Sequence, residues 1–395
     1  MSLGIDFGTA HTRAVASPGA EERGTTPGEV LDVNAWPESV VPSMVLVPPE
    51  GIVVGDAAIA GARQRPSCAI HGLKRLLGRL PEDSIARTVA SRSGGSLCLS
   101  GAQLTVRTAE GVAITAENAV SAVLRHVTSQ VLGPAAESPA AVITVPEWYG
   151  PSQESALIAA ARRAGLEILR LIDDAAAMAL ALAFQETSER TVGLINVGAG
   201  SFGVAFINIA PKSIFLLASA SDRRVGGCDV TARLLSEKMG SQLGTEGPAQ
   251  EPFRQAIEEM TQQLALGDEV RRNVPVSDGK MIELAIRGSE LDDALDVLRE
   301  PAAEVYADAL DDAALEPEEV DAVFATGGMS TLPLLSDFIF DLSGQVPQCG
   351  LELQGLAARG AALQAAILSG EIDGPLVFDG KSTGSLNVSD FKEGG

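Results

Sequence analysis

Three short turns that contain glycine each follow a run of apolar residues, and this arrangement suits the binding of phosphate groups. The turns are Gly8-Thr9, Gly198-Ala199-Gly200-Ser201 and Gly327-Gly328. Glycine lets the backbone approach a ligand closely, and successive N–H groups in a tight turn form a cradle for oxyanions. The run before the first turn ends at Asp6, whereas the run before the second ends at Asn196. A carboxylate and an amide therefore stand at matching places, which raises the question of what the second turn can hold.

The turns require strands that position them. The stretch "LGIDFGTAHTRAVA" near the N-terminus predicts a strand, a small-residue turn and a second strand that leaves through Val15. About 190 positions later, "VGLINVGAGSFGVAFINIA" predicts the same order of elements. The recurrence indicates an internal duplication, although two hairpins alone can also arise by chance.

Helices and further buried strands fill the rest of the chain. The stretch "AAVITV" predicts a buried strand that Pro146 stops. The residues after it predict a helix to about Ala164, a glycine stop at Gly165, a short strand and a second helix. Helices are also expected in "ITAENAVSAVLRHVTSQVL", in "GGCDVTARLLSEKMGSQL" and after the third turn. This alternation indicates an α/β protein with mostly buried sheets.

Composition excludes several classes of protein. The 395 residues have room for two domains, and a hydrophobic content of 46% can fill both cores. A net charge of −23 repels phosphate backbones and anionic lipid, so nucleic acid and membrane surfaces are poor partners. The four cysteines form no C-x-x-C pair, which favours packed thiols in a reducing compartment. The longest apolar stretch, around residues 175 to 184, is too short to span a bilayer. We therefore expect a soluble cytoplasmic protein.

Two widespread phosphate-binding motifs do not account for the turns. The sequence contains neither the G-x-G-x-x-G turn that opens a helix nor the G-x-x-x-x-G-K-[ST] loop. Another set of segments does occur in a fixed order: "GIDFGT", "VVPSMVLVPPEGIVVGDAAI", "LKRLLGR", "AVITVPEWYGPSQ", "AGLEILRLIDDAAAMALA", "GAGSFGV", "RVGGCDVTARLL", "VFATGGMSTLP" and "ARGAALQAAILSGE". In this order the chain resembles the ATPase domain of the seventy-kilodalton heat-shock chaperones, within the actin and sugar-kinase superfamily. The resemblance runs from residue 3 to about residue 379.

The resemblance implies an actin-like ATPase fold, in which two lobes built from duplicated ribonuclease-H-like domains enclose a nucleotide cleft. Lobe I would comprise residues 1–188 with the first phosphate hairpin and the lysine segment. Lobe II would comprise residues 189–372 with the second phosphate hairpin and the late glycine pair. Residues 373–395 would form a linker-like segment and a polar tail. The implied cofactors are ATP or ADP with Mg²⁺.

The resemblance also implies roles for individual residues. Asp6 matches the first carboxylate of the magnesium shell, and Thr9 matches the hydroxyl of the phosphate turn. Lys74 matches the lysine that reaches the γ-phosphate. Asp174 stands where the family has a glutamate near the attacking water, and its carboxylate sits about one methylene further back. Asp6, Lys74 and Asp174 are the expected catalytic residues. The residues expected around the nucleotide are Gly8, Thr9, Ala10, Gly198, Ala199, Gly200, Ser201, Gly226, Gly227, Glu258, Gly327 and Gly328.

Without the resemblance, two of these residues have simpler interpretations. Lys74 lies beside Arg75 and Arg79, which is typical of a solvated helix face. Asp174 follows Asp173, and paired acids are common where a helix starts.

The second hairpin departs from the family pattern. Asn196 replaces an acidic residue before the glycines, and Gly203 replaces the aspartate at the end of Gly-Gly-Gly-Thr-Phe-Asp. Magnesium prefers hard anionic oxygen, so Asn196 would contact the ion only through a bound water and without charge. A unit charge at about 4 Å is worth roughly 4 kcal/mol at an effective dielectric near 20, against ~1.4 kcal/mol for a tenfold change in rate. We therefore expect magnesium to be held more weakly and ATP hydrolysis to be slow or absent.

The adenosine side and the C-terminal end depart as well. Thr261 and Gln262 stand at two basic positions of the helix that clamps the adenosine, and Thr331 replaces the arginine that stacks on the base. Each lost contact would weaken binding by ~0.5 to 2 kcal/mol. The stretch "PLVFD", residues 375–379, matches the interdomain linker, and the peptide-binding domain has no counterpart in this sequence. The sixteen residues that follow are expected to form a disordered tail or a short docking motif for a separate protein.

Three functions are compatible with these features. The first is a chaperone-like regulator that binds ATP, hydrolyses it slowly and signals to a separate partner through residues 375–395. The second is a degenerate pseudo-ATPase that does not bind nucleotide and acts as an interaction scaffold. The third is an actin-like polymer former or a small-molecule kinase of the same superfamily.

Overall fold

The computed structural model describes most of the chain. The described residues are 1–18, 32–92, 94–134, 136, 138–184, 188–239, 247–264, 268–275 and 281–379, without the side chains of residues 351 and 352. The predicted tail, residues 380–395, lies outside them. None of the helices among the described residues is long and apolar enough to cross a membrane. The cytoplasmic location stays a prediction.

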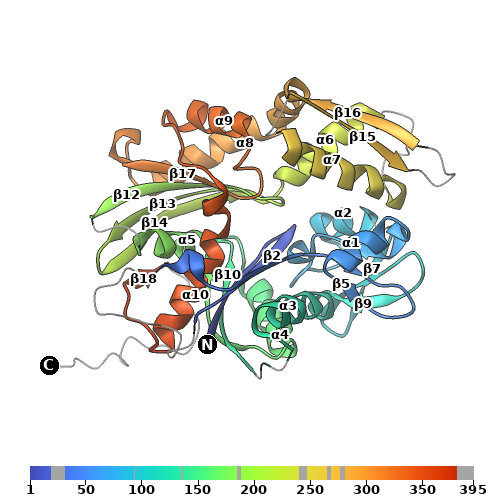
Figure 1. Ribbon diagram of the computed structural model, residues 1–395, viewed down its shortest axis with the longest axis horizontal. Coiled ribbons are helices and arrows are strands. Elements are labelled where there is room, and N and C mark those ends of the chain that lie inside the picture. The colour runs from blue at the N-terminus through green and yellow to red at the C-terminus, as the bar shows by residue number, and fades with distance from the viewer. Residues whose placement is uncertain are drawn as a thin grey trace.

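Two five-stranded sheets that share the arrangement of four of their strands form the centre of the molecule (Figure 1). The first has the order β11-β10-β1-β2-β3 and consists of β1 (Ser2–Phe7), β2 (His11–Ala16), β3 (Glu38–Pro42), β10 (Ala140–Val145) and β11 (Glu167–Asp173). The second has the order β17-β12-β13-β14-β18 and consists of β12 (Arg190–Val197), β13 (Phe202–Ala210), β14 (Ser213–Asp222), β17 (Ala322–Thr326) and β18 (Leu376–Phe378). In each sheet a hairpin pairs on one side with a parallel strand and on the other with an antiparallel strand. The four strands β10-β1-β2-β3 and β17-β12-β13-β14 share this topology, which agrees with the predicted duplication. The fifth strand differs, because β11 lies beside β10 whereas β18 lies beside β14.

The two hairpin turns close in the same way. In the first hairpin, β1–β2, the amide of Gly8 donates to the carbonyl of His11 at 3.0 Å. In the second hairpin, β12–β13, the amide of Gly198 donates to the carbonyl of Ser201 at 3.0 Å. The two residues between each bonded pair form the tip of the turn, so the two tips have equivalent places in the two sheets.

Helices cover both sheets, and two of them lie between the sheets (Figure 1). The first sheet packs with α3 (Ala116–Leu132), α4 (Pro151–Arg163), α5 (Asp174–Ala183) and α10 (Leu356–Leu368). The second packs with α6 (Gly227–Met239), α7 (Glu251–Gln263), α8 (Gly288–Asp312) and α9 (Pro333–Ser343). Helices α5 and α10 contact each other. They also pack with strands of both central sheets, either directly or through the hydrophobic clusters that they share with those strands. The predicted helices and buried strands are therefore confirmed by these elements, while the lobe boundaries at residues 188 and 372 stay predictions.

Smaller elements lie beside the two central sheets. Beside the first sheet lie α1 (Asp56–Ala62), α2 (Ser84–Arg92), β4 (Val45–Leu46), β5 (Val53–Val54), β6 (Ala69–Ile70), β7 (Ser96–Ser100), β8 (Gln103–Arg107) and β9 (Ala113–Thr115). Beside the second lies the antiparallel pair β15 (Glu269–Pro275) and β16 (Met281–Arg287), which packs on α7.

Close packing of α10 fixes the strand that carries Asp6. A Cβ at Gly360 of α10 would overlap the backbone of Ala177 in α5, so a larger residue cannot occupy this crossing. The facing residues of α10 and α5 are almost all buried alanines and leucines, which allow the two helices to approach each other and β1. The position of β1, and of the hairpin that follows it, is therefore set by a tightly packed interface.

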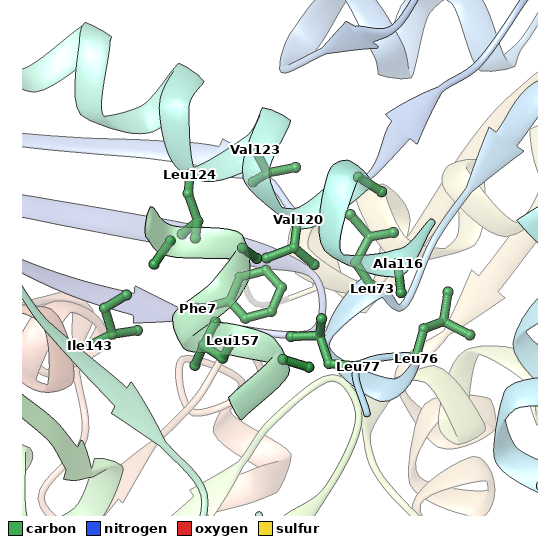
Figure 2. Packing of buried hydrophobic residues seen from close by; sticks show 14 of the residues in the cluster. Phe7, Leu73, Leu76, Leu77, Ala116, Val120, Val123, Leu124, Ile143 and Leu157 are labelled. Atoms are coloured by element: carbon green, nitrogen blue, oxygen red, sulfur yellow. The ribbon is translucent and has the colours of Figure 1, made fainter. Parts of the chain in front are cut away.

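The lysine segment is held by a hydrophobic cluster below the first hairpin. Figure 2 shows Phe7 at the end of β1 surrounded by side chains of α3 and α4 and by leucines of the lysine segment. Leu73, Leu76 and Leu77 are fully buried in this cluster, and burial of each contributes about 1.5–3 kcal/mol. Residues Leu73–Arg75 form a 3-10 helix rather than part of a solvated α-helix, and Lys74 is only 8% exposed. The interpretation of this segment as a solvated face is therefore wrong.

Candidate functional site

A cleft of about 510 Å³ lies between the two hairpins. It is lined by Asp6, Gly8, Thr9, Ala10, His11, Arg13, Val40, Lys74, Asp174, Asn196, Gly198, Ala199, Gly200, Ser201, Gln262, Gly327, Gly328, Thr331 and Gln354. The cleft thus brings together residues of all three glycine turns with the predicted lysine and aspartates. Three of the predicted site residues, Gly226, Gly227 and Glu258, do not line it.

Asp6 is the residue before the last of β1 and lines the cleft. Its parallel neighbour on β10 is Thr144, whose hydroxyl donates to Asp6 Oδ1 at 2.9 Å. Its antiparallel neighbour on β2 is Arg13, which also lines the cleft. Residues directly opposite on paired strands point to the same face of a sheet, so all three side chains lie on the cleft face.

Asn196 occupies the equivalent place in the second sheet. Its parallel neighbour on β17 is Thr326, and its antiparallel neighbour on β13 is Gly203. Thr326 is 2% exposed, and its hydroxyl has no hydrogen-bond partner among the described residues. The second hairpin therefore has a threonine, Thr326, at the place of Thr144 in the first. It has no carboxylate at the place of Asp6 and no side chain at the place of Arg13.

The N-terminus of α6 supports the second turn from behind. The amide of Gly227 donates to the carbonyl of Gly198 at 2.9 Å, and the amide of Cys228 donates to the carbonyl of Ala199 at 2.8 Å. The amides of Ala199 and Gly200 form no hydrogen bond to any described residue. Because its carbonyls are bonded to α6, the turn holds these amides in place for an anion in the cleft. The Gly226-Gly227 pair thus positions the turn rather than lining the cleft.

The two turns touch across the cleft. A Cβ at Gly200 would lie 2.5 Å from the hydroxyl of Thr9, so only glycine allows the second turn to approach the first this closely. Arg75 reinforces the contact, because its guanidinium donates to the carbonyl of Gly200 and, at 3.1 Å, to that of Arg223. Further out, His71 pairs with Glu251 of α7 at 3.0 Å. These contacts join the first and second halves of the chain beside the cleft.

Asp174 and Lys74 lie on the same side of the cleft. Asp173 caps α5 by accepting from the amide of Ala175 at 2.9 Å, which leaves Asp174 to point into the cleft. Burial, together with the charges of Asp6 and Glu147, raises the pKa of Asp174 to about 6, although Lys74 opposes the shift. A carboxylate with a pKa near the working pH is suited to accept a proton from water. Asp174 therefore has the electrostatic environment of a general base.

Glu147 is a carboxylate beside the cleft that the sequence interpretation missed. It follows Pro146 at the end of β10 and accepts hydrogen bonds from the hydroxyl of Ser221 on β14 at 2.8 and 2.9 Å. Glu147, Asp174, Asn196, Gly203 and Ser221 line one small cavity of about 30 Å³. A carboxylate from the first half of the chain thus lies close to the place where Gly203 leaves none. Its position directly after a buried strand and proline was the available signal.

Part of the cleft lining is uncharged. Gln262 at the end of α7, Thr331 and Gln354 belong to this part. Glu258 lies one helical turn before Gln262 on α7 and outside the lining. These three side chains of the described lining offer hydrogen bonds to a ligand but no charge.

The donor set fits a phosphate-containing ligand better than a directly bound metal. The free turn amides, Thr9 and Lys74 suit phosphate oxygens. Among the described residues no three His, Cys, Asp or Glu side chains are grouped so that they could hold a metal ion. Mg²⁺ usually keeps several waters and binds through one or two carboxylates plus substrate phosphates, so Asp6 would suffice to hold it only together with those phosphates.

Comparison with known proteins agrees with this arrangement. The sequence profile of the family described as "Hsp70 protein" matches residues 2–389. A chaperone protein HscA homolog of Bordetella petrii is 27% identical over 379 residues, which cover 94% of this chain and 58% of that protein. The chain therefore spans less than two thirds of the length of this relative. The expected α/β, actin-like ATPase fold is confirmed, and the chain belongs to the Hsp70 family.

Proposed function

We propose that this chain binds ATP and ADP in the cleft, hydrolyses ATP slowly or not at all, and regulates or scaffolds a separate protein partner. The observation that carries the proposal is the asymmetry of the two hairpins. Both turns have the backbone geometry of an anion cradle, but the carboxylate Asp6 is matched by the neutral Asn196.

Nucleotide binding is supported by the groups that the cleft retains. The tips of both turns face the cleft, and Gly200 and Thr9 are in contact. Lys74 lines the same cleft from a segment anchored by buried leucines. Hydrogen bonds from a charged donor or to a charged acceptor contribute about 1.5–3 kcal/mol each, so several such contacts give appreciable affinity for a triphosphate.

Impaired hydrolysis follows from the charges that are missing. Phosphoryl transfer depends on a metal ion that offsets charge on the transferred group. With Asn196 and Gly203 neutral, Asp6 holds the ion without help from the second hairpin. Asp174 and Lys74 remain in place to orient water and contact the γ-phosphate, so slow turnover is the expected result rather than a change of reaction.

A separate partner is supported by the surface around β18. Residues 375–379, the linker-like segment, pair in parallel with β14 through Leu376–Phe378. Phe378 and Phe215 stack with ring centroids 4.8 Å apart, and each residue is more than 40% exposed. Asp379 accepts from Arg170 at 2.6 Å and from the amide of Asp173, the residue before Asp174. The segment is thus attached next to the cleft and presents an apolar surface of the kind that partner proteins cover.

Titration calorimetry with ATP and Mg²⁺, run beside a phosphate-release assay, tests the nucleotide part. We expect binding with slow release of phosphate, and at least tenfold faster release from the Asn196→Asp/Gly203→Asp double variant at saturating ATP. Equal release rates for the two proteins would refute the explanation by missing carboxylates. No heat at millimolar ATP would favour the second candidate, a nucleotide-free scaffold, which the uncharged lining at Gln262 and Thr331 also suggests.

Hydrogen exchange tests the signalling part. If nucleotide state is communicated through β18, addition of ATP should change the exchange rate of the amides of residues 376–378, which lie in the edge strand next to β14. Unchanged exchange in these residues, together with demonstrated ATP binding, would count against a nucleotide-regulated partner site.

A further inference from the structure

Arg13 is a cation on the face of the first sheet where Mg²⁺ and phosphates would be expected. It lies directly opposite Asp6 in the β1–β2 pair and lines the cleft with the tips of both turns. The charge of Asp6 opposes the lowering of the Arg13 pKa that burial causes, which reflects the closeness of the two groups. In the second sheet the equivalent position is Gly203. At this position the first hairpin therefore carries a guanidinium and the second carries no side chain.

Glu38 alone does not offset the charge of Arg13, because it is shared with a second guanidinium. Arg13 pairs with Glu38 on β3, and the same carboxylate accepts from Arg359 of α10 at 3.3 Å. Two guanidiniums therefore share one carboxylate. Only Arg13 of the two lines the cleft, and 18% of its side chain is exposed there. A guanidinium has five N–H donors in a planar fork, so donors remain for a phosphate group after one is bound to Glu38.

We propose that Arg13 binds a phosphate group of the nucleotide and makes ATP binding in this cleft largely independent of Mg²⁺. The inference rests on the proposed nucleotide binding and adds the residue that offsets phosphate charge. The cleft is lined by two cations, Lys74 from the lysine segment and Arg13 from β2, and by two carboxylates, Asp6 and Asp174. Arg13 is thus the charge that balances these carboxylates without a metal ion, and the second hairpin adds no further carboxylate. A ligand with several phosphate oxygens can therefore be held by fixed cations and turn amides alone.

Calorimetric titration of the full chain with ATP, once with excess Mg²⁺ and once with EDTA, tests the proposal. The wild-type dissociation constant is expected to rise by no more than about tenfold when Mg²⁺ is removed. Arg13→Gln is expected to weaken binding in EDTA by a further tenfold or more, because a charge-assisted hydrogen bond to phosphate is lost, and by less in Mg²⁺, because the ion then shares the phosphate charge. Arg13→Lys, which keeps the charge, should retain most of the binding in EDTA.

Arg359→Gln is the matched control. It removes the other guanidinium from Glu38 without touching the cleft, and its ATP affinity should equal that of the wild type in both buffers. Loss of ATP binding by the wild type in EDTA would overturn the proposal without any variant. An equal effect of Arg13→Gln and Arg359→Gln would also overturn it, because both would then act through Glu38. Either result would refute only the role of Arg13, because ATP would still bind in the presence of Mg²⁺. If the wild type does not bind ATP in Mg²⁺, the proposed function is refuted together with this inference.

Discussion

The two hairpins that border the cleft have equivalent backbones and different side chains. In the first, Asp6 accepts a hydrogen bond from Thr144 and faces Arg13. In the second, Asn196 lies beside Thr326, whose buried hydroxyl lacks a partner among the described residues. The strand register and the hydrogen bond that closes each turn are nevertheless the same.

This difference separates what the fold requires from what the chemistry requires. The turns depend on backbone hydrogen bonds and on close contacts such as that between Gly200 and Thr9, which tolerate few substitutions. The side chains at the strand ends point into the cleft, where a change of charge costs little packing energy. The second hairpin therefore retains the shape of a phosphate site without its charge, and the first hairpin carries the charges on which any metal-dependent step must rely.

The largest effect is expected when the first hairpin is made to resemble the second. Asp6→Asn removes the hairpin carboxylate that would hold Mg²⁺, and single-turnover phosphate release should fall by about a hundredfold. Asn196→Ala, the matched change in the second hairpin, should alter the rate by less than about threefold, because no charge is lost. Similar losses for the two variants would mean that the hairpins contribute equally and that the asymmetry has no catalytic consequence.

The next effect concerns Asp174, the carboxylate at the base of the cleft. Its pKa is raised to about 6, so it is protonated below this pH and ionised above it. If the ionised form accepts the proton from water, single-turnover phosphate release should increase about tenfold per pH unit as the pH rises toward 6, and level off above it. Asp174→Asn should be slower and independent of pH in this range. A wild-type rate that does not change between pH 5 and 7 would exclude this role.

A smaller effect is expected when the second hairpin is made to resemble the first. Asn196→Asp places a carboxylate beside Thr326 and at the cleft, and it should strengthen ATP binding in Mg²⁺ by about tenfold. The gain should vanish in EDTA, since the new charge then faces the phosphates without an ion. Unchanged affinity in Mg²⁺ would show that the second hairpin does not face the metal.

The sequence was sufficient to predict the turns and most elements, because glycine turns after apolar runs are local signals. Arg13 was missed because it follows Asp6 by seven positions in a strand of mixed polarity, and only the β1–β2 register places the two side chains together. Glu147 was missed because its partner, Ser221, comes from the second half of the chain. Glu258 and Gln262 lie one turn apart on the same face of α7, and only Gln262 lines the cleft. The sequence does not show how far along the helix the cleft extends. Residues whose role depends on long-range pairing cannot be recognised from spacing alone.

The smallest expected effect compares the two threonines that support the hairpins. Thr144→Val removes a hydroxyl that donates to Asp6, and the free energy of unfolding should fall by roughly 1 kcal/mol, the typical net value of one hydrogen bond. Thr326→Val removes a buried hydroxyl without a partner among the described residues, so the protein should be equally stable or about 1 kcal/mol more stable. Chemical denaturation of both variants measures the difference. In the Asn196→Asp background, Thr326→Val should become destabilising, because the new carboxylate gives Thr326 the acceptor that Thr144 has in Asp6. If Thr326→Val is already as costly as Thr144→Val in the otherwise unchanged protein, Asn196 accepts from Thr326, and the two hairpins differ in charge but not in hydrogen bonding.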